Sequence, residues 1–459
     1  MKLIYSILGL LLTCYCNAQV FYADDFIKMV RSNHPMARQA QIGIQKADAD
    51  LLSAKGGFDP VVAMDASRKT FDGKNYYFYT NPEIKIPTWI GADIKAGIEN
   101  NGGQFLSSEI TAGQTSYLGL TLPVAKGLLL DKRRATLQQA RVLREQSEQE
   151  QLNALNNLLF DAYQAYWQWT GRYQLFRIYS RFVTIAQDRL RLVKIGFYNG
   201  ERASVDTIEA LTQVQQFQLL QNEALLQYTN STLDLSNYIW DERDSTYLLS
   251  PTYIPDTTGF SKYVILPDES AIIQQALTAN PLLRIYDFKL NALEIDRKLK
   301  QQNILPSIDL KANLLNRGYN VFKGWNSALF QNNYVWGIDF KLPLFIREGR
   351  GEYRKSVLKI KETSYELSLK RRETENKLRS YLNETSQLQQ QLVISEQAYK
   401  NFQTILTAEY LKFRNGESSL FLINTRENKV IETAEKLISL RIKYLKARYA
   451  VDWSAGLLR

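Results

Sequence analysis

The chain has 459 residues, of which 45% are hydrophobic and 23% are charged, and its net charge is +10. Its lysines and arginines are interleaved with aspartates and glutamates along helical segments, which indicates solvated helix faces and excludes a nucleic-acid-binding surface. Beyond the first residues no apolar stretch approaches 18 residues, so a membrane-spanning helix is excluded as well.

The first 18 residues are typical of a secretory signal peptide. Lys2 precedes an apolar run at residues 3–12, and a small-residue site predicts cleavage before Gln19. One alternative is a membrane anchor, for which the run is too short. The other is lipidation of Cys14, because residues 11–14 resemble a lipobox. Both cysteines lie at or before the cleavage site, so we expect no disulfide in the mature chain.

A first repeat is expected over residues 19–240. An Asn-His-Pro start predicts a helix that ends before Pro60. Period-2 sequence then predicts barrel strands between about 60 and 124, near 61–68 and 117–124. An insertion over residues 70–117 adds strand-like sequence and a turn at residues 100–103. The insertion suggests an elaborated extracellular face.

Long helices follow, over residues 125–238. Proline is absent from 125 to 198, and the helix would reach roughly 100 Å. Its apolar residues alternate steps of three and four, which predicts a coiled coil: Leu152, Leu155, Leu159, Ala162, Tyr166, Trp169, Tyr173 and Phe176. The helix ends at Asn199-Gly200-Glu201, where Asn-Gly permits a chain reversal.

The same order of elements is expected again in a second repeat over residues 269–459, after a proline-containing linker or equatorial segment at 241–268. Barrel strands are predicted at about 306–345 and long helices at 349–452. The tip between these helices is Asn415-Gly416-Glu417. The two halves therefore resemble a duplication.

This arrangement resembles the outer membrane efflux protein family, whose best-known member is TolC. The most specific motifs are Gly57-Phe58-Asp59-Pro60, Leu122-Pro123 through Asp131-Lys132-Arg133-Arg134, Leu342-Pro343-Leu344-Phe345 and the two tips. The Phe-Asp-Pro and Asp-Lys-Arg-Arg segments resemble the Bacteroidetes branch. The resemblance implies an α+β membrane protein with a TolC-like fold. Long α-helices would form a coiled-coil periplasmic tunnel, and each protomer would give four strands to a trimeric 12-stranded outer-membrane β-barrel.

The implied function is that of an outer-membrane channel subunit in a tripartite efflux or type I secretion system. A homotrimer would provide a passive exit duct, with a periplasmic extension, and would work with a periplasmic adaptor and a proton-driven or ATP-driven inner-membrane pump. Its other partner would be outer-membrane lipid. The alternative is the periplasmic adaptor itself, which would need one helical hairpin rather than two. The cargo stays open.

No catalytic constellation or cofactor site is expected, so the chain is not predicted to be an enzyme. Its single histidine, His34, lies beside a helix-start proline without a cysteine or carboxylate cluster, which favours a structural role.

The resemblance also implies a periplasmic gate on the returning helices. Asp206 falls in the family's tip pattern, and Glu209 lies three residues on, on the same helix face. In the second half the acidic positions of the best-known relative fall at or near Phe421 and Asn424, so an apolar ring of Phe421 is the expected departure. The alternative is that Asp206 and Glu209 are ordinary solvated charges.

Both tips are expected to dock an adaptor. The residues concerned are Asn199, Gly200, Glu201, Asn415, Gly416 and Glu417.

Overall fold

The computed structural model describes residues 19–243, 245–250, 252–319 and 333–459. The predicted signal peptide, Cys14 and part of the loop before residue 334 lie outside the described residues. In the described part of the chain, no helix is both long enough and apolar enough to cross a bilayer. The chain forms two compact units. Unit 1 comprises Met1–Gln41, Leu152–Asn280 and Arg372–Arg459, and unit 2 comprises Ile42–Gln151 and Pro281–Arg371.

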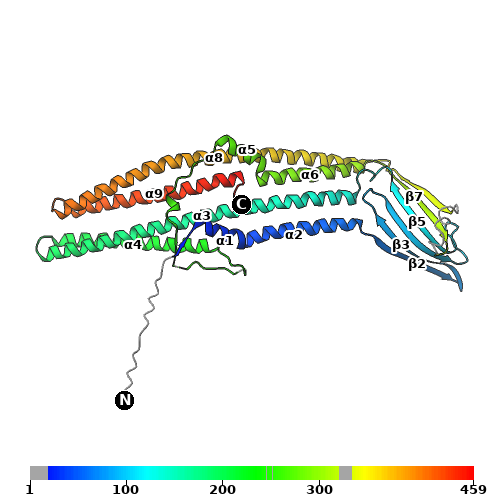
Figure 1. Ribbon diagram of the computed structural model, residues 1–459, viewed down its shortest axis with the longest axis horizontal. Helices are drawn as coiled ribbons and strands as arrows, with labels where there is room; N and C mark the ends of the chain where they lie inside the picture. The colour runs from blue at the N-terminus through cyan, green and yellow to red at the C-terminus, as the bar shows by residue number, and fades with distance from the viewer. Residues whose placement is uncertain (1–18, 244, 251, 320–332) are drawn as a thin grey trace, which may run out of the picture. The chain divides into compact units, whose positions relative to one another are not determined.

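Figure 1 shows the elements in chain order. The helices are α1 Ala23–Asn33, α2 Pro35–Lys55, α3 Lys132–Tyr198, α4 Ser204–Ser236, α5 Glu269–Ala279, α6 Pro281–Gln302, α8 Arg347–Arg414 and α9 Leu420–Ala455. The strands are β1 Gln19–Phe21, β2 Val61–Phe71, β3 Lys74–Pro87, β4 Asp93–Gly102, β5 Gly113–Pro123, β6 Tyr253–Pro255, β7 Ser307–Arg317 and β8 Tyr334–Lys341. Two 3₁₀ turns, Gly56–Phe58 and Gly259–Ser261, complete them.

The expected fold class, long helices with a set of antiparallel strands, is confirmed, and α3 and α8 are 67 and 68 residues long. Two helices begin at the expected prolines, Pro35 and Pro281, because proline fits the first turn, where its missing N–H would have no helical acceptor. The expected helix start near residue 125 is wrong. Gly127 has a φ of +88°, which is incompatible with a helix, and Asp131 caps α3 by accepting the Arg134 N–H at 2.8 Å.

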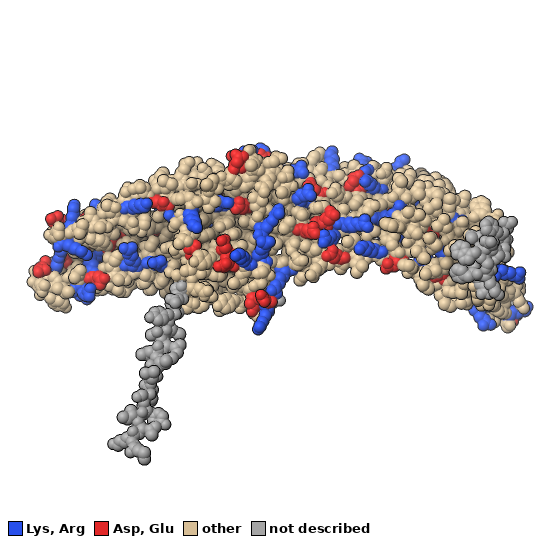
Figure 2. Space-filling model, in the orientation of Figure 1, with Lys and Arg blue, Asp and Glu red and all other residues tan. Residues whose placement is uncertain are grey.

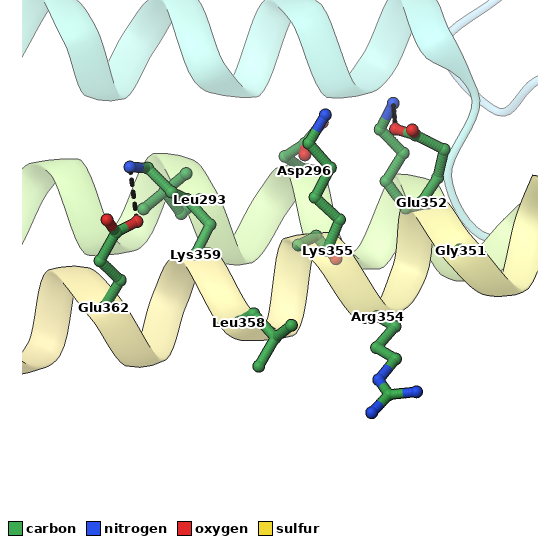
Figure 3. A pocket seen from close by; sticks show the side chains of 11 residues that line it. Leu293, Asp296, Gly351, Glu352, Arg354, Lys355, Leu358, Lys359 and Glu362 are labelled. Carbon is green, nitrogen blue, oxygen red and sulfur yellow. Dashed lines mark hydrogen bonds and ion pairs between the residues drawn. The ribbon is translucent and has the colours of Figure 1, made fainter.

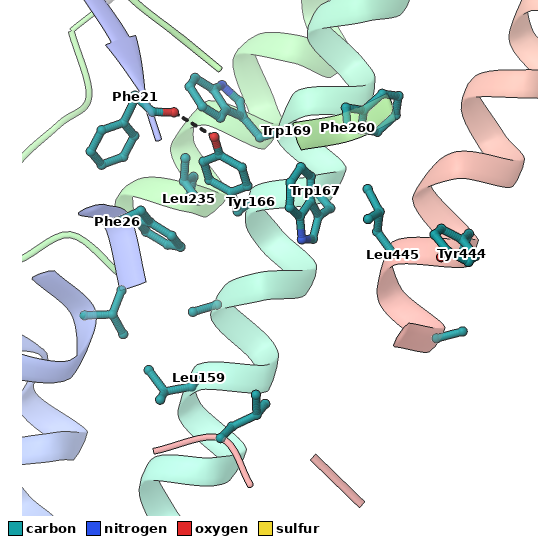
Figure 4. Packing of buried hydrophobic residues seen from close by; sticks show 14 of the residues in the cluster. Phe21, Phe26, Leu159, Tyr166, Trp167, Trp169, Leu235, Phe260, Tyr444 and Leu445 are labelled. Carbon is teal, nitrogen blue, oxygen red and sulfur yellow. Dashed lines mark hydrogen bonds between the residues drawn. The ribbon is translucent and has the colours of Figure 1, made fainter. Parts of the chain in front are cut away.

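The core of unit 1 lies where α3 packs against the N-terminal segment (Figure 4). The seam residues Tyr166 and Trp169 are fully buried, as the heptad pattern predicts. The Tyr166 hydroxyl donates to the Phe21 carbonyl at 2.6 Å, and the Trp169 Nε1–H donates to Thr232 Oγ1 at 2.9 Å. β1, which contains Phe21, pairs in parallel with β6, so chain segments distant in sequence meet on α3.

His34 belongs to the same unit. Its ring stacks on Tyr238 at a centroid distance of 5.9 Å, and its Nδ1 accepts the Met36 N–H at 3.2 Å. Burial lowers the pKa of His34, because the charged imidazolium is poorly solvated there. These contacts agree with the structural role expected for this residue.

Unit 2 contains a single antiparallel sheet with the order β2-β3-β4-β5-β7-β8. Among the described residues the sheet therefore has six strands rather than the four expected, because the predicted insertion folds into a hairpin, β3–β4, within the sheet. The expected turn at residues 100–103 is also corrected. Asn100, Asn101 and Gly102 are in β4, and the chain leaves the strand at Gly103, whose φ is +124°.

The sheet has two faces of opposite character, because partners in the register share a face. We call the first the apolar face; its exposed side chains are Val62, Met64, Ile84, Ile86, Ile94, Ile98, Leu118, Leu120, Leu310, Leu314, Trp336 and Ile338. We call the other the polar face; it carries Asp65, Glu83, Lys85, Asp93, Lys95, Glu99, Thr121, Asp309, Lys311, Asn313, Asp339 and Lys341.

Candidate functional site

Both long helices of unit 1 end in the same backbone motif. Gly200 and Gly416 have φ values of +77° and +78°, the left-handed conformation that glycine adopts without steric cost. The Glu201 N–H donates to the Gly196 carbonyl at 2.8 Å, and the Glu417 N–H donates to the Lys412 carbonyl at 2.9 Å. These are Schellman caps, in which the last carbonyls of a helix are satisfied as the chain reverses.

The cap geometry leaves the expected docking residues at the surface. Asn199, Gly200, Glu201, Asn415, Gly416 and Glu417 are all exposed. The Arg202 guanidinium lies over the Phe413 ring, 4.8 Å from its centroid, so the α3–α4 tip contacts the α8–α9 tip. A small cluster of Val193, Ala210 and Leu420 packs beneath this contact. The two tips thus form one composite surface at one end of unit 1.

The structure brings two of the four expected gate residues together. Asn424 Nδ2 donates to Glu209 Oε1 at 3.0 Å, which joins α9 to α4. Asp206 is half-buried one turn before Glu209. Phe421 does not join this contact: 69% of its side chain is exposed, one turn before Asn424 on α9. An exposed aromatic ring therefore lies one turn of α9 from the hydrogen bond between Glu209 and Asn424.

A buried ion pair about one turn of α9 beyond Asn424 is absent from the sequence-based predictions. The Arg189 guanidinium of α3 donates to both carboxylate oxygens of Glu427 on α9, at 2.5 and 2.8 Å. The Tyr410 hydroxyl of α8 donates to the same carboxylate at 2.5 Å. Glu427 is fully buried, and burial raises the pKa of Tyr410 above its usual range, with the Glu427 carboxylate adding to the effect. These hydrogen bonds join the α3–α4 hairpin to the α8–α9 hairpin.

The sequence does contain a signal for this pair. Arg189 interrupts the apolar seam formed by Phe182, Ala186 and Val193, and Glu427 interrupts the seam of Leu420, Ile423, Val430 and Ala434. A charge at a buried heptad position is costly unless it is paired. Opposite charges in two such seams therefore indicate that the two helices face each other at that level.

A hollow of unit 2 lies between α6 and α8 (Figure 3). Its lining carries both signs of charge: Lys359 pairs with Glu362 at 2.7 Å, and Lys300 pairs with Glu352 at 3.2 Å. Lysines, arginines and acidic residues are likewise interspersed over the face that Figure 2 shows. In the part of the chain that the structure describes, no cluster of His, Cys, Asp and Glu could hold a metal ion. The groove therefore has the features of a neutralised helix surface rather than a ligand site.

Residues 272–456 match the family model described as "Outer membrane efflux protein". No curated protein matches the chain. Among solved structures, the chain is similar to the CmeC outer membrane channel of Campylobacter jejuni, with 15% identity and a TM-score of 0.66 over 95% of this chain and 86% of that one. It is also similar to the VceC outer membrane protein of Vibrio cholerae, with 12% identity and a TM-score of 0.64 over 95% and 96%. A third similar structure is the MtrE outer membrane channel of Neisseria gonorrhoeae, with 12% identity and a TM-score of 0.65 over 95% of this chain and 89% of that one.

Two long helical hairpins joined to a two-faced antiparallel sheet define a TolC-like outer-membrane channel fold. The family match covers residues 272–456, so the second half of the chain is similar in sequence to outer membrane efflux proteins. The solved structures that share this fold are described as outer membrane channels or outer membrane proteins.

Proposed function

We propose that the chain is the outer-membrane subunit of a tripartite efflux or type I secretion system, and that three copies form a passive exit duct. The sheet of unit 2 would lie in the outer membrane, and the helices would line a periplasmic tunnel. A periplasmic adaptor would join the duct to an inner-membrane pump, which would supply the energy.

The observation that carries this proposal is the two-faced sheet. Its apolar face exposes large side chains to the surroundings, including Val62, Met64 and Trp336, while the opposite face carries ion pairs such as Lys85 with Asp93 at 2.9 Å. In water such a face would be an aggregation hazard. Facing lipid, with the charged face toward a water-filled lumen, it has the alternation of a membrane barrel.

A stripe of exposed apolar residues on α4 supports association with further copies. The residues are Val205, Ile208, Leu219, Leu226 and Leu233, and they share one heptad frame. A heptad seam of this kind needs a facing helix to exclude water from it. In the proposed trimer, a helix of the next copy would supply that partner.

Membrane fractionation of the native host tests the proposal, combined with electrophoresis of the purified chain with and without boiling. We expect the chain in the outer-membrane fraction and a trimer that dissociates to monomers on boiling. A chain recovered as a soluble monomer would refute the channel.

We also propose that the Asn199 and Asn415 tips dock the adaptor. Replacing both with phenylalanine keeps the glycine caps intact but puts bulk on the exposed surface. We expect loss of export, measured as susceptibility of the host to exported compounds, with unchanged trimer yield. The matched control is Asn383→Phe, an exposed asparagine in the middle of α8, which should export normally. Normal export by the double tip variant would contradict docking at this surface.

For the gate, we propose that Phe421 forms the apolar constriction in the trimer, with Asp206, Glu209 and Asn424 beside it. The support is the exposure of the Phe421 ring next to the Glu209–Asn424 hydrogen bond. Hydrophobic constrictions of this kind close a pore by excluding water.

A further inference from the structure

The hairpin β3–β4 is paired along both of its outer edges. β3 pairs with β2 from the cross-strand pair of Val61 and Lys85 to the turn at Asp72 and Gly73. β4 pairs with β5 over nine successive residue pairs. The hairpin therefore separates β2 from β5 completely. It lies within the sheet rather than beside it.

The hairpin also has the same two faces as the rest of the sheet. Ile86 and Ile94 share the apolar face with Leu120 and Trp336, and 37% and 38% of their side chains are exposed. The neighbouring Lys95 lies on the polar face. A hairpin that only decorated an extracellular loop would have no need for this alternation.

The β3–β4 turn lies at the helix end of the sheet. Asp93, the first residue of β4, pairs with Arg133 in the first turn of α3 at 2.8 Å. The turn residue Gly91 has a φ of +94° and leaves no room for a Cβ beside Arg134. Trp89, in the same turn, is 81% exposed. An exposed tryptophan at the end of barrel strands is typical of a membrane–water interface.

From these observations we propose that β3–β4 is a lipid-facing part of the barrel, and that the trimer closes with eighteen strands instead of twelve. This proposal rests on the proposed trimeric channel. Among the described residues, the outer edges of β2 and β8 have no partner strand. β2 starts at the helix end and β8 finishes there, so β8 of one copy would meet β2 of the next in antiparallel orientation, with three copies contributing six strands each.

A wider barrel changes which solutes the membrane part can pass. Barrel diameter grows about linearly with strand number, so eighteen strands give a diameter about 1.5 times that of twelve, in the range where porins hold an aqueous channel. The hairpin adds Glu83, Lys85 and Lys95 to the polar, lumen-facing surface. The barrel would thus admit bulky, hydrated, polar cargo, and size selection would lie at the helix tips.

Single-cysteine variants in purified trimers, reconstituted into phosphatidylcholine liposomes, test the placement of the hairpin. The variants form matched neighbours: Lys85→Cys with Ile86→Cys, and Lys95→Cys with Ile94→Cys. In the liposomes, a membrane-impermeant maleimide should label the cysteines at positions 85 and 95 but not those at positions 86 and 94. A fluorophore attached in detergent at 86 or 94 should then be quenched by brominated lipid.

Equal labelling of both faces without quenching would overturn the wider barrel while leaving a trimeric channel standing. A soluble monomer would instead overturn the channel itself.

Disulfide trapping tests how the barrel closes. Ala63 and Tyr117 share a row of the sheet but lie three strand spacings apart, about 14 Å, which is too far for a disulfide. The Ala63→Cys/Tyr117→Cys variant should therefore stay reduced in the membrane. Cysteine pairs scanned along β2 and β8 should cross-link different copies. A disulfide between 63 and 117 within one copy would show that β2 pairs directly with β5, and would refute the proposal.

Discussion

Replacing Glu427 with alanine is expected to lower the free energy of opening at the helix tips by about 3–5 kcal/mol, because it leaves a buried charge without its partner. Arg189 has a side-chain exposure of only 7%, and both of its bonds to Glu427 are lost. The Tyr410 hydroxyl loses its acceptor as well. Hydrogen exchange of the α3 and α9 amides in the purified protein measures this change.

Two further variants make the result specific. Glu432→Ala removes an exposed carboxylate of the same helix, paired with Lys429 at 2.7 Å, and should cost about 0–1 kcal/mol. The double variant Arg189→Met/Glu427→Leu removes both charges and should recover much of the loss, because apolar residues can replace a buried pair at little cost. Equal exchange in Glu427→Ala and Glu432→Ala would contradict the role assigned to the pair.

The Arg189–Glu427 pair lies where it would affect both the stability of the helix tips and the opening of the proposed gate. Arg189 and Glu427 join the α3–α4 hairpin to the α8–α9 hairpin, close to the contact between Glu209 and Asn424. If the proposed gate opens by separating these hairpins, opening has to break the buried ion pair between Arg189 and Glu427. The Glu427→Ala trimer should then show a higher open fraction in planar bilayers than the Glu432→Ala trimer.

Much of the helical architecture could be predicted from the sequence. Regular apolar steps of three and four mark α3, and the Asn-Gly pairs mark where α3 and α8 end, at Gly200 and Gly416. These signals are local and agree with each other, so they survive tertiary packing. The division into two tandem repeats stays a prediction, although the element order of the two halves is similar.

The additional hairpin was harder to predict because its sequence contradicts strand rules. β3 contains Pro82, which is disfavoured within strands, and its run of aromatic residues at 76–79 does not alternate with polar ones. In β4, Asn100-Asn101-Gly102 is typical of a turn. Gly102 is instead a strand residue that leaves space for the Phe78 ring, because a Cβ at position 102 would clash with that ring. Cross-strand packing, invisible to a local pattern, decides the structure here.

The candidate site shows the same limit. The tip glycines were predictable from local backbone chemistry, and their conformation agrees with the prediction. The Arg189–Glu427 pair joins residues 238 positions apart, so no local window contains both. Its sequence signal, a charge within each of two apolar seams, becomes interpretable only once the facing helices are known.

Replacing Trp169 with alanine is expected to destabilise unit 1 by about 3–5 kcal/mol, the usual cost of deleting a buried aromatic side chain. Trp169 is fully buried, and its ring lies 5.9 Å from that of Tyr166 and 6.5 Å from that of Phe21. The change also leaves Thr232 Oγ1 without the indole donor.

Urea titration followed by limited proteolysis of unit 1 measures the effect. Trp169→Phe keeps most of the ring contacts and should lose less stability than Trp169→Ala, whereas Leu248→Ala, at a position that is 71% exposed, should change it little. Because the cluster joins β1 and α1 to α3, we expect the segment before residue 34 to become protease-sensitive first. Similar losses in Trp169→Ala and Leu248→Ala would mean that the cluster around Phe21 is not what holds the N-terminal segment against α3.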